Sequence, residues 1–177
     1  MNLQFEISDK STIEWYTPPE IIQALGEFDL DPCTSEIAYN LNHSAHRFFT
    51  KEDDGLSKKW SGRVWLNPPY EQPTITRFIE RMALHGNGIA LLYNRCDNKM
   101  FHEIIFPKAD SICFLRDRIY FYRPDGTRGD RPGSGSVLIA FGENNTKAIE
   151  TSGLRGTIFK PLIRRRTAIQ QNLFSSN

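Results

Sequence analysis

The sequence predicts an α/β fold with a mainly parallel sheet, and three observations lead to this prediction. The chain has 177 residues, a length that suits one domain around one core. Short apolar runs alternate with segments of helical periodicity over residues 63–115. Two further apolar runs then follow each other without a helix between them. Because alternating strands and helices form parallel sheets with right-handed crossovers, we expect parallel strands followed by a C-terminal β-hairpin.

The amino-terminal third contains one clear helix start and one short strand. Thr17-Pro18-Pro19-Glu20 predicts a helix start, since threonine caps helices, proline suits the first turn, and an acid suits the positive end of the helix dipole. We expect this helix to end near Gly26. Residues 28–33 alternate between apolar and polar side chains and then reach a proline, which predicts a short strand that enters a loop. Residues 34–62 are polar, and no regular element is predicted there.

The elements after residue 62 follow a clearer pattern. Apolar residues at helical spacing predict helices around residues 75–82 and 100–105, the second capped by Asp97. Apolar runs predict strands at residues 63–66, 88–93, 111–115, 119–122 and 137–141. The last two strands form the expected hairpin, and residues 123–136 connect them.

The composition is typical of an ordinary globular protein. Apolar residues make up 39% of the chain and charged residues 24%. No apolar run is long enough to cross a bilayer, and the first fifteen residues are polar and acidic, so we expect neither a membrane span nor a signal peptide. Cys33, Cys96 and Cys113 show no paired spacing, which favours reduced thiols in a cytoplasmic protein.

Charge is unevenly distributed along a chain whose formal net charge is only +1. Residues 151–177 contain five basic residues and no acid, whereas residues 1–150 carry a net charge of −4. We therefore divide the chain into a single domain over residues 1–150 and a basic C-terminal tail over residues 151–177. A basic tail on an acidic body suits contact with a polyanion, and a solvated tail has the same composition.

The motif Asn67-Pro68-Pro69-Tyr70 follows an expected strand and precedes an expected helix. Ligands of open α/β sheets bind beyond the carboxyl ends of strands, which is where this motif stands. The Asn67 side-chain oxygen and the Pro68 carbonyl can accept the two hydrogens of a planar amine, and consecutive prolines hold that carbonyl in place. Two such acceptors favour a pyramidal nitrogen whose lone pair can attack a methyl group on a positive sulfur. Tyr70 offers a flat face on which a flipped-out base can stack.

This tetrapeptide is similar to the catalytic motif of amino-methyltransferases, (D/N/S)PP(Y/F/W). Over residues 13–142 the chain also resembles the phage-type DNA N6-adenine methyltransferase (Dam) family. The resemblance is carried by residues 15–18, 28–33, 53–56 with Trp60, 64–70, the strand at Gly88, and residues 99–105 and 116–121.

The resemblance implies a Rossmann-like fold, S-adenosylmethionine as cofactor, and methylation of adenine N6 in double-stranded DNA at a short site such as GATC. The cofactor-binding residues it implies are Trp15, Tyr16, Thr17, Pro18, Asp29, Asp31, Pro32, Cys33 and Asp54. Among the acids we favour Asp31, because it stands where the expected strand meets the loop. The chain lacks the glycine-rich FxGxG loop common in such enzymes, and the amino-terminal half of the sheet must be abbreviated.

Arginines form a second group of candidate residues, in and around the loop over residues 123–136. Guanidinium groups suit contacts to phosphates and guanine edges, so we expect this loop to contact DNA; an exposed loop of mixed charge is the alternative. The expected DNA-binding residues are Arg95, Arg116, Arg118, Arg123, Arg128, Arg131, Arg164, Arg165 and Arg166.

Two other functions remain open. The same motif serves cytosine N4, guanine N2 in RNA and glutamine in proteins, since each presents a planar amine. The missing glycine-rich loop is also compatible with a non-catalytic DNA-binding protein on a degenerate methyltransferase fold. His43 and His46 lie three residues apart without a third ligand at suitable spacing, so we expect no metal site.

Overall fold

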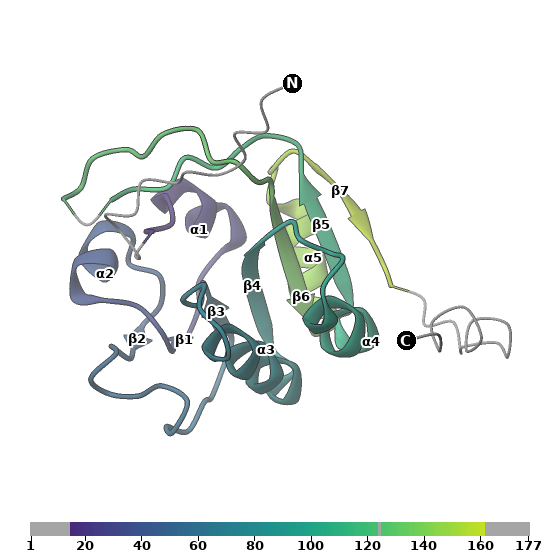
Figure 1. Ribbon diagram of the computed structural model, residues 1–177, viewed down its shortest axis with the longest axis horizontal. Coiled ribbons are helices and arrows are strands. Elements are labelled where there is room, and N and C mark those ends of the chain that lie inside the picture. Colours follow the sequence, from purple (N-terminus) through teal and green to yellow (C-terminus); the bar gives the residue numbers. More distant parts are fainter. Residues whose placement is uncertain (1–14, 124, 162–177) are drawn as a thin grey trace, which may run out of the picture.

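Seven strands form one sheet in the computed structural model, which describes residues 15–123 and 125–161 (Figure 1). Their order across the sheet is β2-β1-β3-β4-β6-β5-β7. The strands are β1 (Leu30–Asp31), β2 (Arg47–Phe48), β3 (Val64–Leu66), β4 (Gly88–Tyr93), β5 (Ser111–Leu115), β6 (Ser136–Phe141) and β7 (Gly156–Phe159). The helices are α1 (Pro19–Leu25), α2 (Glu36–Asn42), α3 (Thr74–His85), the π-helix η1 (Phe101–Ile105), α4 (Phe106–Lys108) and α5 (Glu143–Thr151).

The sheet is mixed, so the expectation of a mainly parallel sheet is not confirmed. β2, β1, β3 and β4 are parallel neighbours, whereas β6 is antiparallel to both β4 and β5, and β7 is antiparallel to β5. The antiparallel pairs contain most of the paired residues, because β1, β2 and β3 are only two or three residues long. The chain returns from β5 to β6 without a helical crossover, and this return makes the second half of the sheet antiparallel.

The expected hairpin between residues 119–122 and 137–141 is wrong in its first strand. β6 forms as expected, but its antiparallel neighbours are β4 and β5, and not residues 119–122. Residues 119–122 form only isolated bridges, including one to Tyr16. Their alternating pattern has another cause: Ile119 and Phe121 are buried, so this loop packs alternate side chains on the core.

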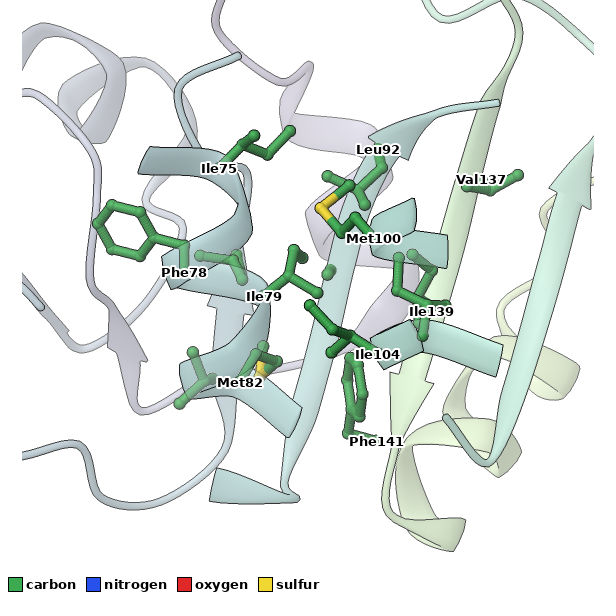
Figure 2. Close-up of a cluster of buried hydrophobic side chains, with 14 of the residues drawn as sticks. Ile75, Phe78, Ile79, Met82, Leu92, Met100, Ile104, Val137, Ile139 and Phe141 are labelled. Atoms are coloured by element: carbon green, nitrogen blue, oxygen red, sulfur yellow. The ribbon is translucent and has the colours of Figure 1, made fainter. Parts of the chain in front are cut away.

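Two hydrophobic layers cover the sheet, because alternate residues of each central strand point to opposite faces. Val64 and Leu66 of β3 belong to the layer that includes α3 and η1, whereas Trp65 between them packs with α1 and α5. Figure 2 shows the first layer, in which Ile79 of α3 and Ile104 of η1 face the side chains of β4 and β6. The central strands are thus held from both faces, and their carboxyl ends remain available for a site.

The sheet extends beyond the expected domain boundary at residue 150. α5 spans that boundary, and β7 is the edge strand beside β5. The sequence pattern does not reveal α5 because polar residues face the core: Asn145 and Thr146 are fully buried, and Thr146 Oγ1 shares a hydrogen bond of 2.9 Å with Ser111 Oγ.

The remainder of the expected basic tail lies outside the described residues. This includes the three consecutive arginines, Arg164, Arg165 and Arg166. Within residues 15–123 and 125–161, no helix has the length and apolar character needed to cross a membrane.

Neither of the two expected residues caps its helix. The N-cap residue of α1 is Pro18 and no side chain caps this helix, so Thr17 is not a cap. Ahead of η1, the Asn98 Oδ1 accepts a hydrogen bond of 3.1 Å from the Phe101 N–H, in place of the expected Asp97.

Candidate active site

A pocket of about 920 Å³ opens at the carboxyl ends of β1 and β3. Its walls are residues 15–17, the loop after β1, α2, the turn at residues 50–56, and the segment that begins with the Asn67 motif. Eleven of the expected catalytic and cofactor residues line it: Trp15, Tyr16, Thr17, Asp31, Pro32, Cys33, Asp54, Asn67, Pro68, Pro69 and Tyr70. Pro18 and Asp29 do not line it. Segments that are distant in the sequence therefore form one cavity.

The Asn67 amide is held in one orientation at the end of β3. Its Nδ2 donates hydrogen bonds of 3.2 Å to the Trp15 carbonyl and of 3.2 Å to Thr17 Oγ1. Because a backbone carbonyl can only accept, Nδ2 must face Trp15 and Oδ1 must point the other way. Asn67 Oδ1 is buried and has no hydrogen-bond partner among the described residues. The side chain is thus a fixed acceptor with an unused oxygen.

Tyr70 is anchored to the neighbouring strand. Its ring packs against Tyr93, with ring centroids 4.4 Å apart, and its hydroxyl donates a hydrogen bond of 3.3 Å to the Leu91 carbonyl of β4. Burial raises the pKa of the Tyr70 hydroxyl well above its usual range, so the group remains a donor. Tyr93, which the sequence did not single out, occupies one side of the Tyr70 ring.

The two acids of the first strand have different surroundings. Asp31 is buried, and its carboxylate accepts hydrogen bonds from Ser44 Oγ at 2.6 Å and from the Cys33 N–H at 3.2 Å. Burial raises the pKa of Asp31 from 3.8 to about 6, despite these two bonds. Asp29 lies two residues before the carboxyl end of β1 and accepts a bond of 2.6 Å from the Arg63 N–H. Asp31 therefore faces the pocket, and Asp29 joins β1 to the start of β3.

A glycine from another segment allows a close backbone approach to the loop after β1. A Cβ atom added to Gly55 would lie 1.9 Å from the Pro32 carbonyl oxygen, so only glycine fits against the loop after β1. The turn before it is held by Asp53, whose carboxylate accepts bonds of 2.9 Å from both the N–H and the hydroxyl of Thr50. These bonds lower the pKa of Asp53, while Asp54 lines the pocket.

Asn42, at the end of α2, is a pocket residue that the sequence did not single out. Its Nδ2 donates a hydrogen bond of 3.2 Å to the Thr17 carbonyl, and its Oδ1 is buried without a partner among the described residues. Thr17 therefore contacts two asparagines, through its carbonyl and through its hydroxyl. No local sequence signal identified Asn42, because its role depends on a residue 25 positions away.

The expected DNA-binding arginines that the structure describes do not line the pocket. Arg123 forms an ion pair of 2.8 Å with Asp130, and Arg128 stacks on the Tyr120 ring with its Cζ 4.2 Å from the ring centroid. The guanidinium of Arg118 is partly buried, and its Nη1 has no hydrogen-bond partner in the described part of the chain. The remaining ones with described side chains are exposed: Arg95, Arg116 and Arg131.

The loop that carries these arginines lies beside the pocket. Tyr16 and Tyr122 exchange backbone hydrogen bonds of 2.9 Å each. Gly129 lies so close to the Trp15 ring that an added Cβ would be 2.6 Å from Trp15 Cζ3. Figure 1 shows the segment between β5 and β6 extending over the end of the molecule that contains α1 and α2.

His43 and His46 do not belong to a candidate metal site. His43 ends α2 in a left-handed conformation, and the His46 ring lies 3.6 Å from the Glu27 carboxylate. Within the described ranges, no three His, Cys, Asp or Glu side chains are grouped so that they could hold a metal ion.

A family model and a curated relative match this chain. A family model described as DNA N-6-adenine-methyltransferase (Dam) matches residues 5–164. A curated DNA N-6-adenine-methyltransferase of Escherichia phage T1 is 40% identical over 87 residues, which cover 44% of this chain and 34% of the relative. The match thus spans about a third of that relative's length. No solved structure matches. Since the family match includes the Asn67 motif and all walls of the pocket, the chain belongs to the DNA N-6-adenine-methyltransferase (Dam) family.

Proposed function

We propose that this protein transfers a methyl group from S-adenosylmethionine to adenine N6 in double-stranded DNA. The observation that carries the proposal is the orphaned Asn67 Oδ1, an acceptor held in place by the hydrogen bonds of Nδ2 to Trp15 and Thr17. A buried acceptor without a partner is costly, so such a group calls for a donor that arrives with a ligand. The family match supports adenine N6 as that donor.

The strand arrangement supports a Rossmann-like methyltransferase fold. β1 lies between β2 and β3, so the chain moves to one side of β1 and then crosses to the other. In open α/β sheets, such a topological switch point is where ligands bind, beyond the carboxyl ends of the strands. Asp31 at the end of β1 and Asn67 after β3 both line the pocket at this point.

The pocket fits S-adenosylmethionine in size and in polarity. Its volume of about 920 Å³ lies in the range of small-molecule sites. The ligand carries two positive charges and several hydrogen-bond donors, and the pocket is lined by Asp31, which has a carboxylate, and by Asn42, whose Oδ1 has no partner among the described residues. When bound, S-adenosylmethionine supplies a methyl group on a positive sulfur, which the N6 lone pair takes as the carbon–sulfur bond breaks and one N6 proton leaves to water.

The residues of the motif would act on the adenine amine. Asn67 Oδ1 and the Pro68 carbonyl accept its two hydrogens, and the nitrogen becomes pyramidal with its lone pair free for attack. Pro68 and Pro69 restrict the backbone at this carbonyl. Tyr70 gives the flipped base a ring to stack on, and its own position is fixed by the hydroxyl bond to β4.

DNA contact is assigned to the segment between β5 and β6, with the short target site that the family resemblance suggests, such as GATC. This segment lies against Trp15 at the pocket and carries five arginines. Within this segment we assign a DNA contact first to Arg118, because its Nη1 has no hydrogen-bond partner among the described residues. A phosphate oxygen would provide an acceptor for it.

Expression in a methylation-deficient bacterial host tests the proposal directly. Mass spectrometry of hydrolysed DNA should detect N6-methyladenine, and mapping of the modified adenines should give one short site. Asn67→Ala should lower the methylation rate about a hundredfold to a thousandfold, because it removes one preorganised acceptor of the transition state. Asn40→Ala, an exposed asparagine of α2, is the matched control and should change nothing. Methylated RNA or protein without methylated DNA would contradict the proposed substrate.

A further inference from the structure

Asn42 and Asn67 form a paired arrangement around Thr17. Asn42 donates to the Thr17 carbonyl and Asn67 donates to the Thr17 hydroxyl, each over 3.2 Å. Each amide therefore turns its NH2 group toward Thr17, and its oxygen takes no part in these bonds. Both oxygens are buried and lack a partner among the described residues, and both side chains line the same pocket. Asn42 is only 7% exposed, so bulk water does not satisfy its oxygen.

The second oxygen requires a donor other than the adenine amine. The two hydrogens of N6 are already matched by Asn67 and by the Pro68 carbonyl. The remaining donors belong to the cofactor: the amine of its adenine, the ribose hydroxyls and the ammonium group of its methionine part. Of these, only the ammonium group is positively charged and offers three hydrogens.

The surroundings of Asn42 favour the charged donor. Two residues further along the chain, Ser44 donates to the Asp31 carboxylate over 2.6 Å. The other bond to Asp31 comes from the Cys33 N–H, so both of these donors are neutral. A buried carboxylate held only by neutral donors is stabilised by a nearby positive charge. A neutral amide oxygen and a carboxylate, on two side chains that line the same pocket, suit an ammonium group better than a hydroxyl.

We propose that Asn42 Oδ1 accepts a hydrogen bond from the ammonium group of the methionine part of the cofactor, beside the Asp31 carboxylate. Asn42 is then a specificity-determining residue that selects ligands with the amino-acid end. This inference rests on the proposed function, because it takes S-adenosylmethionine as the occupant of the pocket. It assigns the two orphaned oxygens to different ligands, Asn67 to the base and Asn42 to the cofactor.

Titration calorimetry with two product-like ligands tests the assignment. S-adenosylhomocysteine has the amino-acid end, whereas 5′-methylthioadenosine has the same adenosine and sulfur without it. Asn42→Ala should weaken the binding of S-adenosylhomocysteine about tenfold to a hundredfold, as for the loss of a hydrogen bond to a charged group, and leave the binding of 5′-methylthioadenosine unchanged. Asn40→Ala, an exposed asparagine of the same helix, should leave both affinities unchanged.

Other outcomes overturn the inference in distinct ways. Unchanged affinity of Asn42→Ala for S-adenosylhomocysteine would refute it, and so would an equal loss for both ligands, which would indicate a contact to the adenosine end or a structural role. A second measurement uses the unaltered protein, in case the variant does not fold: an S-adenosylhomocysteine analogue with hydrogen in place of the amino group should bind at least tenfold more weakly than the parent. Equal binding would refute the inference. If the unaltered protein binds none of these ligands, the proposed function itself fails.

Discussion

Replacing Asp31 with asparagine should stabilise the protein at neutral pH and at the same time weaken its binding of the cofactor. The carboxylate is almost completely buried, and burial raises its pKa from 3.8 to about 6. One pKa unit corresponds to about 1.4 kcal/mol, so the ionised group lowers the free energy of unfolding by about 3 kcal/mol. In Asp31→Asn, Oδ1 can still accept from the Cys33 N–H, and Nδ2 can donate to Ser44 Oγ, so both contacts persist.

The sign of the effect follows from the raised pKa. The stability that protonated Asp31 contributes is fully present below about pH 4 and is lost as the pH rises through about 6. Asparagine does not titrate, so the variant should be more stable than the unaltered protein by about 1 kcal/mol at about pH 4.5 and by about 3 kcal/mol at about pH 8. Affinity for S-adenosylhomocysteine should fall about tenfold to a hundredfold in the variant, because a charge-assisted contact is lost.

Urea unfolding at a series of pH values, without ligand, measures the change in the free energy of unfolding. Titration calorimetry measures the change in affinity for S-adenosylhomocysteine. Asp29→Asn serves as the control for affinity, because Asp29 lies outside the pocket and bonds to the Arg63 N–H. If Asp31→Asn and the unaltered protein lose stability in parallel between pH 4.5 and pH 8, the buried-carboxylate reasoning is refuted. If the variant is more stable but binds S-adenosylhomocysteine normally, Asp31 has no role in binding the cofactor.

Two further changes test the close contacts around the pocket. Gly55→Ala should reduce the free energy of unfolding by about 1–3 kcal/mol and weaken ligand binding, since its Cβ would lie 1.9 Å from the Pro32 carbonyl oxygen; Gly133→Ala, with no atom within 4 Å of the added Cβ, should be close to neutral in thermal unfolding. Thr17→Val should lower the methylation rate about tenfold with little change in the melting temperature, because it removes the hydroxyl that holds Asn67, whereas Thr17→Ser should retain the rate. A normal rate for the valine variant would show that the Trp15 carbonyl alone orients the Asn67 amide.

Several elements could be predicted because their signals are local. β3, α3, β4 and β5 formed where apolar periodicity placed them, and the Asn67 motif stands at the end of a strand as expected. The errors arose where tertiary contacts overrode the local pattern. Residues 119–122 alternate like a strand but pack as a loop, and α5 was missed because Asn145 and Thr146 are buried through hydrogen bonds and not through apolar side chains.

The sequence predicts the position and the chemistry of the candidate site, and the structure adds the contacts around it. The contiguous residues 67–70 indicate a planar amine as substrate, since their types and order are sufficient for that argument. The choice between Asp29 and Asp31 depended on where β1 ends. This strand has only two residues, Leu30 and Asp31, so Asp31 stands at its carboxyl end. The close approach of Gly55 to Pro32 could not be predicted either, because the two residues come from different segments of the chain.

By itself, the sequence indicated the family, the candidate tetrapeptide at residues 67–70 and the strands and helix next to it, because each depends on neighbouring residues. Only the tertiary structure decided which polar atoms are satisfied and which remain free. Thr17 illustrates the difference: as a sequence feature it resembled a helix cap, but it accepts hydrogen bonds from residues 25 and 50 positions away. Those bonds orient Asn42 and Asn67 and leave their oxygens buried without a partner among the described residues, which no local pattern can encode.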